Sequence, residues 1–167
     1  LMMIEQPLEY DDVMDHVQLQ REIATPICLD ESIHTVRIAR DAIEAKACKI
    51  INVKPGRVGG HAESIALHDL CQAHGIPVWH GGMLESGIGR AHNIHLASLP
   101  NFTLPGDVAA SKRYYTPDLI ARGIAVSPDG TIPVATGPGI GVNIVEERVL
   151  VATQRHISLD ASTVKSY

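Results

Sequence analysis

The segment KIINVKPGRVGG (residues 49–60) places an apolar, strand-like run directly before a lysine and a proline–glycine break. Ile50, Ile51 and Val53 have the β-branched character of a strand that is buried on both faces. The run ends on Lys54, and a cation is costly to remove from water. Lys54 therefore either reaches solvent at the end of its strand or stands at the mouth of a site that uses a positive charge.

Strand-like and helix-like segments alternate on both sides of this run. The predicted strands are residues 1–6, 26–32, 49–54 and 77–82, with a further short strand around 101–107. The predicted helices are residues 10–24, 35–48, 61–74 and 87–99, with Thr35 as a helix cap. Short loops between alternating elements predict an α/β fold in which parallel strands are joined by right-handed crossovers.

Polar residues recur at an almost constant interval along this series. Glu5, Asp30, Lys54 and Trp79 are separated by 25, 24 and 25 residues, and the first three end successive predicted strands. A βα repeat of this length places the strand ends side by side, where (β/α) barrels carry their active sites. Open doubly wound sheets also bind ligands at that end, but they usually have a Gly-rich phosphate turn after the first strand. EQPLEYDD (residues 5–12) is no such turn, so a barrel is favoured.

Composition narrows the class of protein and its partners. The 167 residues, 45% of them hydrophobic, suffice for one domain-sized core. The net charge of −5 without a basic cluster gives no reason to expect nucleic acid or a membrane surface as a partner, and no apolar run is long enough to span a bilayer. Cys28, Cys48 and Cys71 show no CxxC spacing, so we expect reduced, buried thiols in a cytoplasmic protein.

The two ends of the chain differ from its middle. The sequence opens directly on the apolar run LMMIE, from which we expect a fragment of a longer protein, the alternative being a short edge strand at a true N-terminus. We expect residues 1–112 to form a partial barrel. Residues 113–167 are expected to pack as a tail on the barrel or on a missing domain. Segments 113–119 and 123–142 of this tail are rich in Gly and Pro, with short β-like pieces and a turn at 128–130.

Glu5 and Asp30 are the candidate metal ligands. Two carboxylates that face a common centre repel each other unless a cation lies between them, and ligands with oxygen donors suit Mg²⁺ or a similar hard ion. The alternative is that each carboxylate pairs with a neighbouring Lys or Arg, or caps the next helix. The spacing of the two residues alone does not decide between these interpretations.

Lys54 and Asn52 are the candidates for contact with a substrate. An ammonium group beside a metal-bound substrate releases its proton more readily, so Lys54 is a possible base; the alternative is a lysine that extends into solvent. A proton α to a carboxylate is weakly acidic, and a divalent ion that stabilises the enediolate makes its removal possible. Asn52 points to the same side of the strand as Lys54, either toward a ligand carboxylate or as an ordinary buried amide.

Five motifs in order, MIEQPL, PICLDES, NVKPGRVGG, GGMLESGIGRAHN and LPGD, resemble the enolase superfamily. More narrowly, they resemble the o-succinylbenzoate synthase / N-acylamino acid racemase family of the muconate-lactonising subgroup. The resemblance implies a modified (β/α)7β barrel, of which this chain would supply strands four to eight. The capping domain and barrel strands one to three, with a KxK motif and a first aspartate ligand, would then be absent, and the isolated chain would be inactive.

The resemblance also implies a role for each matching residue. Glu5 and Asp30 would be two of three ligands to Mg²⁺, or to Mn²⁺ or another divalent ion, and Lys54 would be the catalytic lysine on one face of the substrate. The remaining positions would support the ligands or bind the substrate: Asn52 and Glu31 behind the ligands, Gly82, Met83 and Leu84 at the acyl or succinyl pocket, and Asp107 near the mouth of the eighth strand.

The expected activity is Mg²⁺-dependent removal of an α-proton from a small carboxylate substrate, in a homo-oligomer. The enediolate would either lose a β-hydroxyl to give o-succinylbenzoate for menaquinone biosynthesis, or be reprotonated to racemise an N-acylamino acid. A non-catalytic remnant or assembly subunit is one alternative, because unpaired strands invite pairing. Dipeptide epimerisation or muconate cycloisomerisation is another.

Three further signals are weaker. GPGIGV (residues 137–142) is not expected to bind phosphate, because it leads into a β-like segment and not into a helix. His92 and His95 are spaced for one helix face but lack a third soft ligand, so surface or packing roles are favoured. His80 is a minor candidate for the pocket, and Cys28 and Cys48 are expected to fill the core.

Overall fold

Four short parallel strands form the sheet of the computed structural model, which describes residues 1–158. In sequence order they are β1 (Ile4–Glu5), β2 (Ile27–Leu29), β3 (Ile50–Val53) and β4 (Val78–His80), and each pairs with the next. Register pairs Ile4 with Ile27, Cys28 with Ile50, and Ile51 with Val78. The four predicted strands are thus confirmed in type and place, although each is shorter than predicted.

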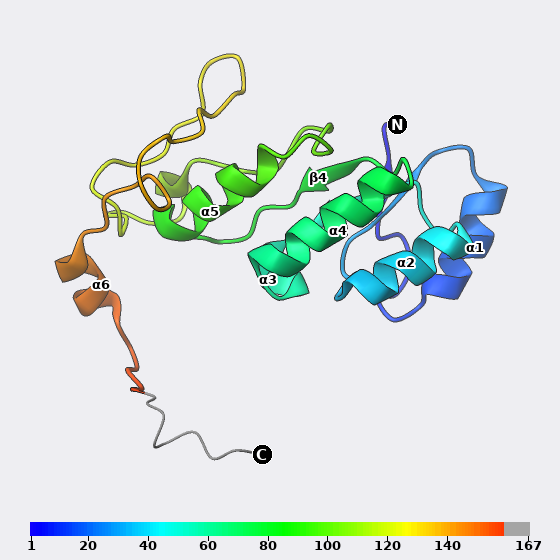
Figure 1. Ribbon diagram of the computed structural model, residues 1–167, viewed down its shortest axis with the longest axis horizontal. Helices are drawn as coiled ribbons and strands as arrows, with labels where there is room; N and C mark the ends of the chain where they lie inside the picture. Colours follow the sequence, from blue (N-terminus) through cyan, green and yellow to red (C-terminus); the bar gives the residue numbers. More distant parts are fainter. Residues whose placement is uncertain (159–167) are drawn as a thin grey trace.

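A helix follows each strand. α1 (Val13–Glu22), α2 (Val36–Ala45) and α4 (His61–Ala73) lie side by side along one face of the sheet, and α5 (Gly87–Ala97) follows β4 (Figure 1). A single turn, α3 (Pro55–Val58), links β3 to α4 and was not predicted. Strands that follow one another in sequence order, with helices along one face, form the wall of a barrel, whereas a doubly wound sheet would reverse its order.

The core lies between the sheet and these helices. Alternate strand residues, among them Ile27, Leu29, Ile51 and Val53, face the helices and are fully buried. Cys48 and Cys71 belong to this core, and burial raises the pKa of each thiol to about 12, so both stay protonated at neutral pH. Cys28 is equally buried, as predicted, but it faces the other side of β2 and lies outside the cluster between the sheet and the helices.

Local capping explains where two helices begin. The Asp12 carboxylate accepts a hydrogen bond from the Asp15 N–H at 2.9 Å, and the Thr35 hydroxyl accepts one from Ile38 at 3.2 Å. Thr35 is the predicted cap. At the other end of α2, Lys46 adopts the left-handed conformation with φ of 62°, which terminates the helix.

The segment after α5 differs from prediction. Residues 101–107 contain no strand; Phe102 makes one parallel bridge to Val78, and the Asp107 N–H bonds to the His80 carbonyl at 2.8 Å. Pro105 interrupts this segment because it has no N–H to donate. Further along the chain, in the predicted tail, residues 146–152 form a short helix, α6 (Glu146–Ala152), which was not predicted. Part of the predicted tail, residues 159–167, lies outside the described residues.

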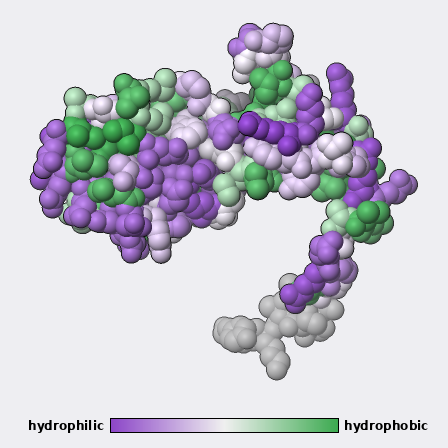
Figure 2. All heavy atoms as spheres, turned by 180° about the vertical axis from the view of Figure 1, so that it is seen from behind, coloured by the Kyte–Doolittle hydropathy of each residue, from purple (hydrophilic) through white to green (hydrophobic). Residues whose placement is uncertain are grey.

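Part of the surface of the molecule is apolar. Figure 2 shows apolar side chains gathered over the half of the molecule that carries β1 and α1, next to hydrophilic ones. The large exposed apolar residues of this half are Leu1, Met2, Leu8, Tyr10 and Met14. Within residues 1–158, none of the helices is both long and apolar enough to cross a membrane.

Candidate active site

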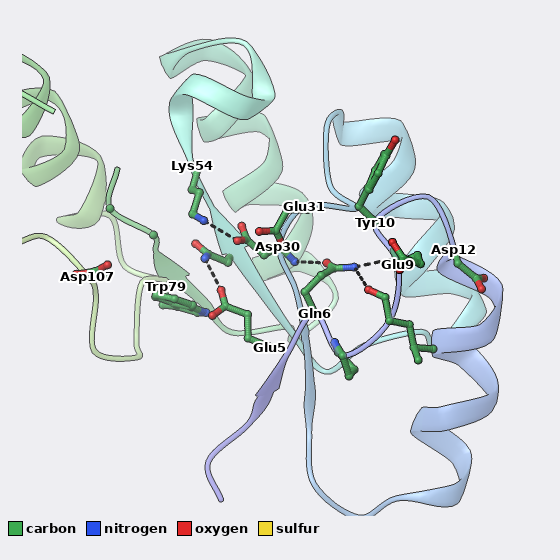
Figure 3. A pocket seen from close by; sticks show the side chains of 15 residues that line it. Glu5, Gln6, Glu9, Tyr10, Asp12, Asp30, Glu31, Lys54, Trp79 and Asp107 are labelled. Atoms are coloured by element: carbon green, nitrogen blue, oxygen red, sulfur yellow. Dashed lines mark hydrogen bonds and ion pairs between the residues drawn. The ribbon is translucent and has the colours of Figure 1, made fainter. Parts of the chain in front are cut away.

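An open cleft of about 880 Å³ lies at the carboxyl ends of the four strands (Figure 3). It brings together seven of the nine predicted site residues: Glu5, Asp30, Glu31, Asn52, Lys54, Gly82 and Asp107. Met83 and Leu84 do not line it; they are exposed on the following loop. The regular spacing of strand ends along the sequence therefore becomes proximity in space, as the βα repeat predicted.

Asp30 is the most buried charge in the cleft, with 3% of its side chain exposed. Its Oδ2 accepts a hydrogen bond from the Lys54 ammonium at 2.5 Å, and its Oδ1 pairs with the guanidinium of Arg57. The Asp30 N–H donates to Gln6 Oε1 at 2.9 Å. A buried carboxylate needs such partners, because burial without them would cost several kcal/mol.

Glu5 and Asn52 form the second pair. Glu5 is exposed, and its Oε1 accepts a hydrogen bond from Asn52 Nδ2 at 2.8 Å. Asn52 is fully buried, and its Oδ1 has no hydrogen-bond partner among residues 1–158. A buried acceptor left unpaired is costly, and a ligand that satisfied this oxygen would remove that cost.

Arg57 joins the ends of β2 and β3, and it was not among the site residues predicted from the sequence. Besides Asp30, its guanidinium donates to the Ile33 carbonyl at 2.7 Å and to the Asn52 carbonyl at 2.5 Å. Burial lowers the pKa of Arg57, and the neighbouring Asp30 charge opposes that shift. The sequence does hold a clue to this contact. Arg57 stands three residues after Lys54, and one helical turn, here α3, places a residue at that spacing next to the end of the strand.

Alternation along the strands explains which side chains face the cleft. Cys28 lies two residues before Asp30, and Trp79 two before Gly81, so these pairs share the open face. Trp79 lines the cleft and donates its indole N–H to Cys28 Sγ at 3.2 Å. A Cβ at Gly81 would collide with the Asn52 amide and lie 2.5 Å from Lys54 Cε. Glycine at this position thus leaves room for both polar side chains.

Gln6 is another residue that the motif reading passed over. It holds a positive φ of 37°, unusual for a residue with a side chain, at the turn that follows β1. Its amide donates to Ser32 Oγ at 2.7 Å, while its carbonyl oxygen accepts from the backbone of Asp30 and Ser32. Gln6 therefore fixes the end of β1 against the end of β2.

The possible ligand atoms in the cleft are of the chemical type that binds a hard divalent cation. The carboxylates of Glu5 and Asp30 and the unpaired Asn52 oxygen are all oxygen donors, the type that Mg²⁺ and Mn²⁺ prefer. Among residues 1–158, no three His, Cys, Asp or Glu side chains gather into a group that could hold a metal ion. An ion bound here would need further ligands from water, substrate or other protein segments.

His80 does not face the cleft. It is 1% exposed on the helix side of β4, and neither ring nitrogen has a hydrogen-bond partner in the part of the chain that the structure describes. Burial lowers its pKa to about 4, so the ring is neutral at pH 7. His92 packs edge-on against His61 with ring centroids 5.0 Å apart, a packing role of the kind that was favoured.

Comparison of the sequence with known proteins identifies the family of this chain and its relatives. Residues 1–148 match the family described as enolase C-terminal domain-like. The chain is 58% identical over 147 residues to an N-succinylamino acid racemase of Amycolatopsis, a match that covers 88% of this chain and 39% of the relative. It is 54% identical over 147 residues to the o-succinylbenzoate synthase of Bacillus subtilis, with coverage of 88% and 39%.

Solved structures give the same result. An enolase-superfamily member from Listeria innocua superposes with a TM-score of 0.87 at 40% identity, covering 93% of this chain and 42% of the other. One from Enterococcus faecalis gives a TM-score of 0.85 at 44% identity, covering 90% and 41%. The chain thus spans well under half the length of the relatives that it matches.

Proposed function

Because this chain belongs to the enolase C-terminal domain-like family, and its βα units are part of an enolase-type barrel, we propose that it supplies one side of an active site that removes a proton α to a carboxylate. One observation carries the proposal: Glu5, Asp30 and Lys54, from three neighbouring strand ends, meet in one open cleft. With a divalent cation held between the two carboxylates, this arrangement would suit a negatively charged substrate that loses a proton to or beside the ammonium.

The proposed reactions are the dehydration that gives o-succinylbenzoate, on the route to menaquinone, and the racemisation of an N-acylamino acid. Relatives named for each reaction are similarly close, at 54% and 58% identity, which supports both activities equally. A chloromuconate cycloisomerase is only 26% identical, so cycloisomerisation is less well supported. The substrate class common to the two favoured reactions is a small carboxylate with an acyl or succinyl arm.

Each polar residue then has a proposed task. Glu5 and Asp30 would hold the divalent cation, which when bound would offset the negative charge that grows on the substrate carboxylate as the α-proton leaves. Lys54 Nζ would hold or move that proton, since among residues 1–158 it is the one ammonium that lines the cleft. Arg57 would fix the Asp30 carboxylate in place, and Asn52 would orient Glu5.

We propose that the site is completed by protein segments beyond these four strands. Among the described residues, β1 pairs with β2 alone, and the chain just before β1 carries the exposed apolar side chains of Leu1 and Met2. Exposed apolar surface of this kind is typical of a face that another segment covers. The relatives are longer than the matched region, which supports the same proposal.

Exchange of the substrate α-proton tests the role of Lys54. In the protein expressed from its complete gene, with Mg²⁺, N-succinylamino acids should exchange their α-proton for deuterium in D₂O. Lys54→Ala should slow exchange for at least one enantiomer by about 100-fold or more, the usual contribution of a general acid or base. Lys49→Ala is the matched control, because Lys49 is exposed just before the opposite end of the same strand. Unchanged exchange for both enantiomers in Lys54→Ala would refute the proposal.

A further inference from the structure

The loop between β4 and α5, residues 81–86, displays two large apolar side chains to solvent. Met83 is 54% exposed and Leu84 is 67% exposed, directly after Gly81 and Gly82, which line the cleft. Exposed apolar side chains beside a cleft do not hold a loop in one conformation by themselves, because they gain nothing from burial there. The backbone of this loop must be held by other contacts.

Arg90 and Glu85 supply those contacts at Met83. Arg90, on α5, has only 1% of its side chain exposed, and its Nη2 donates to the Met83 carbonyl at 2.8 Å. Glu85 Oε2 accepts from the Met83 N–H at 2.8 Å and lies 3.1 Å from Arg90 Nη2. Both backbone groups of Met83 are therefore held by one ion pair. Hydrogen bonds to charged groups are the stronger kind.

Neighbouring segments reinforce the same loop. Arg90 Nη1 reaches the Asp107 carbonyl at 3.5 Å, and a Cβ at Gly82 would collide with that carbonyl. The Tyr115 hydroxyl donates to the Leu84 carbonyl at 2.8 Å. The loop thus presents flexible apolar side chains on a backbone that is fixed at consecutive residues.

We propose that Arg90 and Glu85 are positioning residues that fix the backbone at Met83 and Leu84, and so determine how these two side chains pack against the apolar part of the substrate arm. This inference rests on the proposed function. Neither residue touches the cleft; each acts through the backbone of the loop. An arm with methylene groups gains free energy from contact with Met and Leu, whereas a short acetyl group reaches less of that surface.

The test compares substrate arms. The variants are Arg90→Gln and Glu85→Gln in the protein expressed from its complete gene, assayed with N-succinyl and N-acetyl forms of one amino acid. We expect each variant to raise KM for the N-succinyl substrate and to lower the preference for it over the N-acetyl substrate by roughly tenfold, with kcat changed far less. Arg37→Gln is the control, since that arginine side chain is 76% exposed on α2 and should change neither value.

Hydrogen exchange gives a second readout that needs no substrate. The Met83 amide should exchange roughly tenfold faster or more in Arg90→Gln and Glu85→Gln, while core amides of β3 stay protected. Glu85→Gln covers the case in which Arg90→Gln does not fold, because the Glu85 side chain is 20% exposed and its replacement has the same shape.

Three results would overturn the inference: an unchanged preference between the two arms, an equal loss of kcat for both arms, or an unchanged Met83 amide in the folded variants. Failure of the proposed function is a separate result, because it would appear as intact α-proton exchange in Lys54→Ala. The exchange rate of the Met83 amide tests the Arg90–Glu85 contact in either case.

Discussion

Two neighbouring parts of the cleft are built in different ways. The carboxylate–lysine cluster, made of Glu5, Asp30, Asn52 and Lys54, is held by contacts between side chains at the ends of β1 to β3. The β4–α5 loop, residues 81–86, is held by contacts from side chains to its backbone. Substitutions in the cluster should therefore change charge and chemistry, whereas substitutions in the loop should change the path of the chain.

The charges of the two regions differ as well. Cluster groups are paired: Asp30 contacts both Lys54 and Arg57, and Glu5 accepts a hydrogen bond from Asn52. His80, directly before the loop, is buried without a hydrogen-bond partner among the described residues, and burial lowers its pKa to about 4, so the ring is neutral at pH 7. A paired, partly solvated set of charges can exchange partners with a ligand. When a neutral buried group gains a proton, it can only destabilise the folded state.

The largest expected effect is at Gly82. A Cβ there would collide with the Asp107 carbonyl and lie 2.9 Å from Arg90 Nη1, so the backbone itself would have to move. We expect Gly82→Ala to lower the free energy of unfolding by about 3 kcal/mol or more, measured by urea denaturation. Gly56→Ala is the matched control: nothing lies within 4 Å of a Cβ at that position.

We expect Gly56→Ala to change stability by less than about 1 kcal/mol, because alanine fits a helical turn with no new contact. Equal stability for Gly82→Ala and the native protein would contradict the view that the backbone of the loop is closely packed. The distinction between the two regions would then be lost.

Much of the cluster was predictable from the sequence, because periodicity encodes it. The intervals between Glu5, Asp30, Lys54 and Trp79 reflect one βα repeat, and parallel strands bring their ends to one edge. Two residues spaced i and i+2 share a face, which correctly paired Asn52 with Lys54. The contact of Asp30 with Arg57 was not predicted, because it depends on the α3 turn. Short apolar or glycine-rich runs give little periodic signal for such a turn.

The loop contacts could not be read from the sequence in the same way. Asp118 accepts a hydrogen bond from the Gly87 N–H at 2.8 Å across 31 residues, so the start of α5 is capped by a side chain that no local pattern connects to it. The predicted strand at 101–107 failed for a related reason: its pairing depends on tertiary contacts, and Pro105 removes a donor. Long-range contacts to the backbone leave no spacing signature.

The next largest effect is a pH dependence from His80. Because burial lowers its pKa from 6.5 to about 4, the unfolded chain binds a proton in this range that the folded chain does not. Stability should be complete above about pH 6.5, fall as the pH drops toward 4, and lose about 2 kcal/mol from this residue. Urea denaturation at pH 7, 5.5 and 4.5 measures the loss.

His80→Leu isolates this contribution, since it removes the titrating group from the same buried position. The variant should lose less stability than the native protein over that interval of pH. Parallel curves for the two proteins would show that His80 is hydrogen-bonded or solvated, and would remove one contrast between the loop and the cluster.

The smallest expected effect concerns the affinity of the cluster for a divalent cation. Lys54 Nζ contacts Asp30 Oδ2 at 2.5 Å, so the ammonium and a metal ion compete for the same oxygen. Lys54→Met should therefore tighten Mg²⁺ binding by roughly fivefold, about 1 kcal/mol for a partly screened charge, measured by titration calorimetry. Arg57 still pairs with Asp30 in this variant, and Lys49→Met should leave the affinity unchanged. Weaker binding in Lys54→Met would instead mean that Lys54 orients Asp30 for the ion, and that the cluster, like the loop, depends on fixed positions more than on exchange of charged partners.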